Sequence, residues 1–234
     1  MSEQYRFPLF WPHVPNKEKL FAELDDTLDT RWIGQGPKVD KFEEAFKTKF
    51  GAEYAVAVNS GTSALHLAYI LAGISRNREL NVISPVFTCT ATNHALLYQD
   101  AKIHFCDVDP NSLNPDPAHA RQLCEKNDIG AIVAVHIGGD PCDIDGFLKL
   151  GEEYSIPVIF DAAQALGAKY NGVSIDFPNN CGFATCHSFQ AIKHITTGDG
   201  GVLVLPTVGK GEGWQWAKDV DSEIQTFMKA KRLR

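Results

Sequence analysis

A lysine and an aspartate in two separate segments are the side chains of this sequence best suited to chemistry. Lys193 lies in HSFQAIKHITTGDGG among small and hydroxyl-bearing neighbours, and Asp161 follows the apolar run PVIF, 32 positions upstream. A lysine amine can bond covalently to an aldehyde, and small neighbours leave room for a flat ring. A carboxylate at a strand end can keep a pyridine nitrogen protonated, which makes the ring an electron sink. The pair therefore predicts a site for pyridoxal 5'-phosphate (PLP).

A third segment, AVAVNSGTSALHLAYILAG, offers a place for a phosphate group. An expected strand at 54–58 runs into the turn SGTS at 60–63 and then into an apolar-periodic helix that ends at Gly73. A glycine-containing turn at a helix N-terminus presents free N–H groups and the positive end of the helix dipole. Ser and Thr cap helices in many proteins, so the segment is informative only together with Asp161 and Lys193.

Four motifs resemble the DegT/DnrJ/EryC1/StrS family of sugar aminotransferases, within the aspartate aminotransferase fold superfamily. They are WIGQGPKVDKFEEAF, AVNSGTSALHLA, DAAQALGA and SFQAIKHITTGDGG, and the match spans residues 5–206. The resemblance implies that Lys193 bonds the cofactor aldehyde and that Asp161 faces the pyridine nitrogen. It also implies that Gly61 and Thr62 in the phosphate turn contact the phosphate, and that Ser188 does so too. Gln164 is expected to face the ring hydroxyl, and Thr92 is expected to contact the cofactor.

One cofactor segment departs from the family's pattern. The resembling proteins usually place an aromatic side chain there that stacks on the cofactor ring. Our alignment of SPVFTCTATN puts Cys89 at that position, with Phe87 two residues earlier. A cysteine makes a thinner, polarisable contact, so we expect weaker cofactor retention rather than lost chemistry.

Near the start, RWIGQGP resembles the family's substrate loop, which makes Arg31, Trp32 and Gly34 candidates for substrate contact. An equally supported interpretation is that Arg31 and Trp32 anchor a helix to the following loop. The far end of the chain lacks a stretch resembling GYNYRMSDLQAA, which in the family supplies an asparagine to the partner subunit's phosphate site. We therefore expect residues 1–206 to form a PLP-dependent transferase large domain. We expect residues 207–234 to form a short helical tail in place of the small domain.

Apolar and polar segments alternate as in a chain of strands and helices. Strands are expected at 54–58, 81–84, 102–106, 130–135, 156–160, 182–186 and 201–205. Helices are expected near 16–29, 38–50, 63–72, 92–99, 116–126 and 143–154. Strands separated by helices favour parallel pairing, so we predict a three-layer α/β/α fold with a central, mostly parallel sheet. Ser60, Thr88, Asp161 and Ser188 follow expected strands, so they can converge at one edge of that sheet.

Composition limits the class of protein. A net charge of −7 argues against a nucleic-acid partner, and no segment approaches the length of a membrane span. The N-terminus has no apolar signal core and the six cysteines form no CxxC pair, so we expect a cytoplasmic protein with reduced thiols. The spacing of Cys181, Cys186 and His187 does not suit a zinc site, so we predict no metal. His136 follows an expected strand and could approach the cofactor, but we favour a core histidine with its hydrogen bonds satisfied.

The resemblance implies a PLP-dependent transamination of a nucleotide-linked keto sugar, with glutamate or glutamine as the amino donor. It also implies a homodimer, because neighbouring subunits close each other's sites in that family. Two alternatives stay open. One is another PLP enzyme of the same fold, such as a lyase or a dehydratase. The other is a homologue that binds the cofactor without catalysis, or does not bind it at all.

Overall fold

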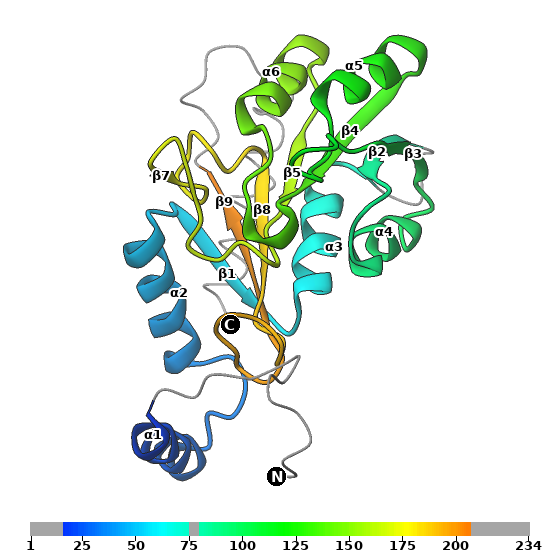
Figure 1. The fold of residues 1–234 in the computed structure, drawn as a ribbon. Helices are drawn as coiled ribbons and strands as arrows, with labels where there is room; N and C mark the ends of the chain where they lie inside the picture. Colours follow the sequence, from blue (N-terminus) through cyan, green and yellow to red (C-terminus); the bar gives the residue numbers. More distant parts are fainter. Residues whose placement is uncertain (1–15, 75–79, 207–234) are drawn as a thin grey trace, which may run out of the picture.

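A seven-stranded sheet forms the centre of the computed structural model, which describes residues 16–74 and 80–206 (Figure 1). The strand order is β1-β9-β8-β5-β4-β2-β3, and β9 alone pairs antiparallel, with β1 on one side and β8 on the other. The other neighbouring pairs are parallel, so six strands share one direction. The strands are β1 (Tyr54–Val58), β2 (Asn81–Pro85), β3 (Lys102–Cys106), β4 (Ile129–Val135), β5 (Val158–Asp161), β8 (Ala184–Ser188) and β9 (Gly201–Leu205).

The predicted three-layer architecture with a mostly parallel sheet is confirmed. α3 (Gly61–Leu71) and α4 (Thr90–Leu97) cover one face, and their apolar residues share a core with the sheet. α2 (Pro37–Phe50), α5 (Pro117–Lys126) and α6 (Ile144–Tyr154) cover the other face. A 3-10 turn, η1 (Ile137–Gly139), precedes α6. Within the seven-stranded sheet, parallel pairing fails only at β9, because a loop without a helix connects it to β8.

One small hairpin in the structure was not predicted from the sequence. β6 (Lys169–Tyr170) and β7 (Val173–Ser174) form a separate two-stranded sheet between β5 and β8 in the chain. Its turn holds Asn171 and Gly172 at φ of 50° and 81°, which suits a tight hairpin. Strands of two residues are too short to show an alternating apolar pattern, so no periodic signal marks them.

The apolar stripe predicted for the first helix is present but uncovered. α1 (Lys17–Thr30) begins at its N-cap Asn16, whose side chain accepts from the N–H of Lys19 at 2.8 Å. No residue of α1 is buried. In Figure 1 the helix lies beyond the end of the sheet at which β1 finishes. Four large apolar side chains on it stay exposed, namely Leu20, Phe21, Leu24 and Leu28.

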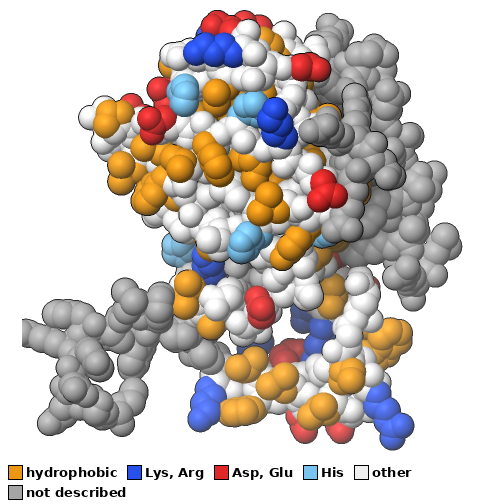
Figure 2. All heavy atoms as spheres, turned by 90° about the vertical axis from the view of Figure 1, so that its right-hand side faces the viewer, with side chains coloured by type: hydrophobic (Ala, Val, Ile, Leu, Met, Phe, Trp, Pro, Cys, Tyr) orange, Lys and Arg blue, Asp and Glu red, His pale blue; other side chains and the backbone are white. Residues whose placement is uncertain are grey.

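Apolar side chains also lie on the outer face of the α3–α4 layer and of the edge strand β3, which Figure 2 turns toward the viewer. They are Ile70, Leu97, Tyr98 and Phe105, all classed as exposed. Within residues 16–74 and 80–206, no helix is long and apolar enough to cross a bilayer. The expected tail at 207–234 lies outside the described residues.

Candidate cofactor site

Three parallel strands bring the predicted residues to one edge of the sheet. β1 ends at Val58, two residues before the N-cap of α3, and β5 and β8 lie side by side with Asp161 opposite Cys186. We expected Asp161 and Ser188 just after their strands, whereas they are the last residues of β5 and β8. The shift follows from hydrogen bonds that continue to the sheet edge, where Ala162 N–H still donates to the Cys186 carbonyl at 2.8 Å.

The N-terminus of α3 forms the phosphate end of the candidate site. The expected SGTS turn is in fact the first helical turn, with Ser60 as N-cap and Gly61 as the first helical residue. Ser60 Oγ accepts from the N–H of Ser63 at 3.1 Å, which leaves the N–H groups of Gly61 and Thr62 without an intrahelical acceptor. A Cβ added to Gly61 would lie 2.8 Å from Ser188 Cβ and 3.2 Å from Ser188 Oγ. Only glycine fits there, so the Ser188 hydroxyl borders the helix N-terminus.

Asp161 is buried and held at both carboxylate oxygens. Oδ2 accepts from Thr92 Oγ1 at 2.7 Å, and Oδ1 accepts from the Ala163 N–H at 3.0 Å. Burial raises the pKa of Asp161 above its ordinary value, while the Thr92 and Ala163 hydrogen bonds and the charge of Lys193 act in the opposite direction. The side chain therefore suits a cationic partner, which would restore the charged form.

Lys193 lies in the loop between β8 and β9 and is half-buried. Its N–H donates to the Gln190 carbonyl at 2.9 Å, and the Phe189 carbonyl accepts from both the hydroxyl of Thr196 and the N–H of Thr197. These short-range bonds hold the loop against the sheet. The Lys193 charge acts on Asp161, so the two predicted catalytic residues belong to one electrostatic environment.

Gln164 lies half-buried, three residues after Asp161. Its Oε1 accepts from the Gly138 N–H at 2.7 Å, which ties it to the turn after β4. Gly139 packs against the same residue, because a Cβ there would lie 2.9 Å from the Gln164 carbonyl oxygen. The Nε2 group of Gln164 can still donate to a ring hydroxyl, and Oε1 keeps one acceptor position.

The predicted ring-stacking segment lies at the start of α4. Cys89 is the exposed N-cap of that helix, and Phe87 in the same loop is 50% exposed. Thr92, predicted to contact the cofactor, is fully buried and donates to Asp161. The hydroxyl oxygens of Thr88 and Thr92 lie 2.8 Å apart. This contact was not predicted, although the two residues have the four-residue spacing of one helical turn.

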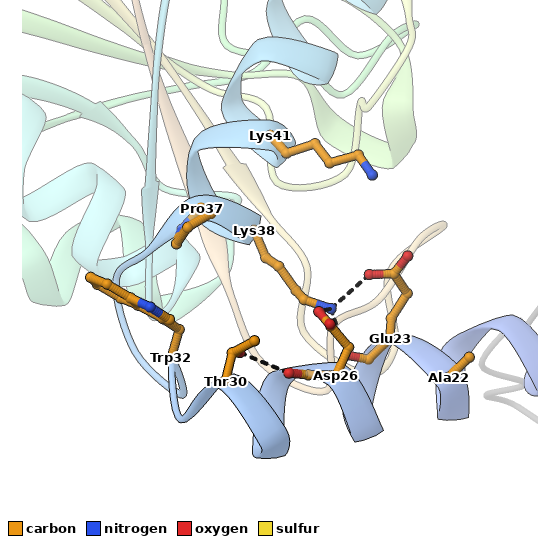
Figure 3. A pocket seen from close by; sticks show the side chains of 8 residues that line it. All are labelled: Ala22, Glu23, Asp26, Thr30, Trp32, Pro37, Lys38 and Lys41. Carbon is orange, nitrogen blue, oxygen red and sulfur yellow. Dashed lines mark hydrogen bonds and ion pairs between the residues drawn. The ribbon is translucent and has the colours of Figure 1, made fainter.

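The predicted substrate loop lies between α1 and α2. Arg31 is the left-handed C-cap of α1 at φ 61°, and a Cβ on Gly36 would lie 2.7 Å from the Trp32 ring. Trp32 borders a cleft of about 580 Å³ (Figure 3). In it, the Lys38 amine pairs with Glu23 at 2.7 Å and Asp26 at 2.9 Å. These contacts support the anchoring interpretation. A Cβ on Gly34 would meet no atom of the described residues within 4 Å.

A second polar group lies on the opposite face of the sheet and was not predicted. His187 Nε2 lies 2.6 Å from Asp176 Oδ1, and both side chains are fully buried.

His136 is buried as expected, and its Nδ1 accepts from the Cys142 N–H at 3.1 Å. Its Nε2 has no hydrogen-bond partner within the described part of the chain, so the expectation of a fully satisfied histidine is wrong. Among the described residues, no group of three or more His, Cys, Asp or Glu side chains is arranged to hold a metal.

Known proteins with similar sequences cover the same part of the chain. A model of the DegT/DnrJ/EryC1/StrS aminotransferase family matches residues 15–207. The uncharacterized protein MJ1066 of Methanocaldococcus jannaschii is 38% identical over 203 residues, which are 87% of this chain and 50% of that protein. The spore coat polysaccharide biosynthesis protein SpsC of Bacillus subtilis is 37% identical over 199 residues, 85% and 48% of the two chains. This chain thus spans about half the length of the curated relatives it matches.

Solved structures show the same relationship. DesI, solved in the presence of its TDP-sugar product, has a TM-score of 0.77 at 31% identity, over 92% of this chain and 50% of that chain. Spr1654 of Streptococcus pneumoniae in its PLP form has a TM-score of 0.79 at 25% identity, over 94% and 57% of the two chains. The fold around the candidate site is therefore that of these proteins.

Proposed function

We propose PLP-dependent amino transfer to a nucleotide-linked keto sugar as the function of this chain, which belongs to the DegT/DnrJ/EryC1/StrS aminotransferase family. The observation that supports it best is the placement of Asp161. A buried carboxylate, held at both oxygens and influenced by the charge of Lys193, lies at the edge where α3 presents its N-terminus. Few ligands need an acid, an amine and an anion site together.

The residues present fit PLP. Gly61, Thr62 and Ser188 would hold the phosphate, since the helix N–H groups and the Ser188 hydroxyl meet where glycine leaves space. Asp161 would hold the pyridine nitrogen, Gln164 the ring hydroxyl, and Lys193 the aldehyde carbon. We assign Cys89 to the ring face. When bound, PLP supplies an electron sink for the bonds of an amino acid's α-carbon.

The chain's own side chains would perform the proton chemistry. Lys193 Nζ, once released from the cofactor by the incoming amino acid, would accept the proton from the donor's α-carbon and return it to the cofactor side. Asp161 would stay ionised and keep the ring nitrogen protonated throughout. Glutamate or glutamine is the donor that we propose from the resemblance.

We also propose that residues 1–206 are the PLP-binding large domain and that two copies form a dimer. Exposed apolar side chains on the α3–α4 layer and on α1 support an interface, because contiguous apolar surface marks association sites. Arg31, Trp32 and Gly34 remain proposed substrate contacts, with Trp32 exposed beside the cleft. Sedimentation of the purified chain tests the dimer, and a monomer at micromolar concentration would contradict it.

A second candidate function is cofactor binding without turnover. Positioning of substrates supplies roughly 7–11 kcal/mol of an enzymatic barrier, so a site with fewer orienting contacts would lose thousands-fold in rate. A coupled transamination assay on the 234-residue chain separates the two functions.

The first experiment is cofactor binding with trapping. Added PLP is expected to give a visible absorption band that Lys193→Ala removes, and borohydride followed by peptide mapping is expected to find the cofactor on Lys193. Lys169→Ala is the matched control, because Lys169 lies exposed on β6 and should leave the band unchanged. Cofactor trapped on Lys169 in the wild type would overturn the assignment.

A further inference from the structure

Two threonines extend the hydrogen bonding of Asp161 toward the start of α4. Thr92 Oγ1 donates to Asp161 Oδ2 at 2.7 Å and lies 2.8 Å from Thr88 Oγ1. A threonine hydroxyl has one proton to donate. Because Thr92 uses its proton on the carboxylate, the proton between the two hydroxyls must come from Thr88. The chain of hydroxyls therefore has one direction, from Thr88 through Thr92 to Asp161.

The first turn of α4 is held in place independently of these hydroxyl hydrogen bonds. The buried Tyr69 hydroxyl of α3 donates to the Thr92 carbonyl at 3.1 Å. Asn93 accepts from Ser84 Oγ at 2.7 Å and donates to the Pro85 carbonyl at 3.4 Å, which ties the turn to the end of β2. The Thr92 side chain is thus presented to Asp161 by a fixed backbone.

The two oxygens of Asp161 are held from different elements. Thr92 on α4 binds Oδ2, and the Ala163 N–H after β5 binds Oδ1. Rotation of the carboxylate would break both bonds, so its plane is fixed. Each oxygen keeps a further acceptor position, since a carboxylate oxygen can accept twice.

Other ionisable groups face Asp161 from the neighbouring elements. Burial and the charge of Asp161 raise the pKa values of Tyr69 and Cys186, so both stay neutral at physiological pH. Lys193 and His187 favour the ionised carboxylate, but less than the Thr92 hydrogen bond does. Thr92 is therefore the strongest of the influences that oppose the burial of Asp161.

We propose that Thr92 and Thr88 are positioning residues for Asp161. Their two hydrogen-bonded hydroxyls keep the Asp161 carboxylate ionised and fix its direction. Thr92 then acts through Asp161 and not by touching the cofactor. The inference rests on the proposed function only for the identity of the cationic group that Asp161 faces. The hydrogen bonds themselves belong to the protein alone, so they can be tested without a cofactor.

The first test follows the Asp161 carboxyl in the cofactor-free protein by NMR, with carbon-13 aspartate and assignment through Asp161→Asn. Thr92→Val is expected to move the titration midpoint of Asp161 to higher pH, and Thr88→Val to move it in the same direction by less. Thr92→Ser, which keeps the hydroxyl, should restore the wild-type midpoint. Thr90→Val on the same helix is the control, because Thr90 is exposed. A wild-type midpoint in Thr92→Val would overturn the proposal, as would Ser and Val behaving alike.

The second test uses the PLP-loaded protein. Thr92→Val is expected to slow the half-reaction with glutamate at least about tenfold, because one hydrogen bond to a charged group is lost, whereas Thr92→Ser should stay within about twofold. Equal rates in Val and Ser variants would contradict the positioning role. If the wild type binds no PLP, the proposed function fails, while the cofactor-free titration still decides whether the hydroxyl chain controls Asp161.

Discussion

At the same edge of the sheet, the buried polar groups on the two faces differ in how many of their atoms are hydrogen-bonded. On the α3–α4 face, both oxygens of Asp161 accept hydrogen bonds. On the opposite face, the next row across β4, β5 and β8 holds His136, Ala162 and His187, and His187 contacts the Phe46 ring of α2. There, three buried atoms have no hydrogen-bond partner within the described residues, namely His136 Nε2, His187 Nδ1 and Asp176 Oδ2.

The difference separates a group arranged for binding from groups sealed in the core. An unsatisfied buried polar atom costs about 1–3 kcal/mol, so the α2 side bears a cost that the α3–α4 side avoids. Burial and the neighbouring His187 lower the pKa of His136 to about 3, so that ring stays neutral over the physiological range. We infer that the Asp161 side contributes to function, and that the His187–Asp176 side contributes mainly to the stability of the fold.

The largest expected effect is on the Asp161 side. Asp161→Asn should still bind PLP through Lys193 but slow proton transfer from the donor by at least about three orders of magnitude, or about 4 kcal/mol, because the ring nitrogen loses its acidic partner. Stopped-flow absorbance of the glutamate half-reaction measures it. A rate within about tenfold of the wild type would remove Asp161 from its assigned role.

On the opposite face the expected loss is in stability. His187→Phe removes the only hydrogen bond of the Asp176 carboxylate among the described residues and leaves that group buried without a partner. Breaking such a pair costs about 3–5 kcal/mol, read as the free energy of unfolding in urea, while PLP affinity should change little. Adding Asp176→Asn should recover most of the loss. A large loss of PLP affinity with unchanged stability would reverse our assignment of the two faces.

Much of the fold was predictable, and the failures have physical causes. The bounds of β1 and β9 agree with the expected 54–58 and 201–205, because apolar runs between turn residues define them. Periodicity correctly placed a helix at α1 but could not tell what covers its apolar side. The Thr88–Thr92 pair carried a usable signal in its four-residue spacing, whereas the hydrogen bond between His187 and Asp176 joins β8 to a residue just after the β6–β7 hairpin, which no periodic pattern marks.

A smaller effect distinguishes two residues of the loop before α4. If Cys89 covers the cofactor ring, Cys89→Ala should weaken PLP binding slightly and Cys89→Phe should strengthen it by up to about tenfold, since aromatic stacking contributes about 0.5–1.5 kcal/mol. Equilibrium dialysis measures the Kd, with Val86→Ala in the same exposed loop as the control. A greater loss in Phe87→Ala than in Cys89→Ala would show that Phe87 contacts the ring and that our alignment is shifted by two residues.

The smallest expected effect is the pH dependence that Asp161 gives to the cofactor-free fold. Burial raises its folded-state pKa, so between the unfolded and folded values the native protein binds more protons than the unfolded chain. Stability therefore contains a term that is present at low pH and is lost as the pH rises through the folded pKa. Asp161→Asn lacks this term, so the difference between the two unfolding curves should grow from about pH 4 upward and then level off. His136 also acts in this window, because its folded pKa of about 3 lies below the value of about 6.5 in the unfolded chain, so its own term raises stability as the pH rises. Both proteins carry His136, so that term cancels in the difference between their curves. Urea unfolding at closely spaced pH values measures the difference. If the wild type gained stability over Asp161→Asn with rising pH, the hydrogen bonds from Thr92 and Ala163 would outweigh the burial of the carboxylate.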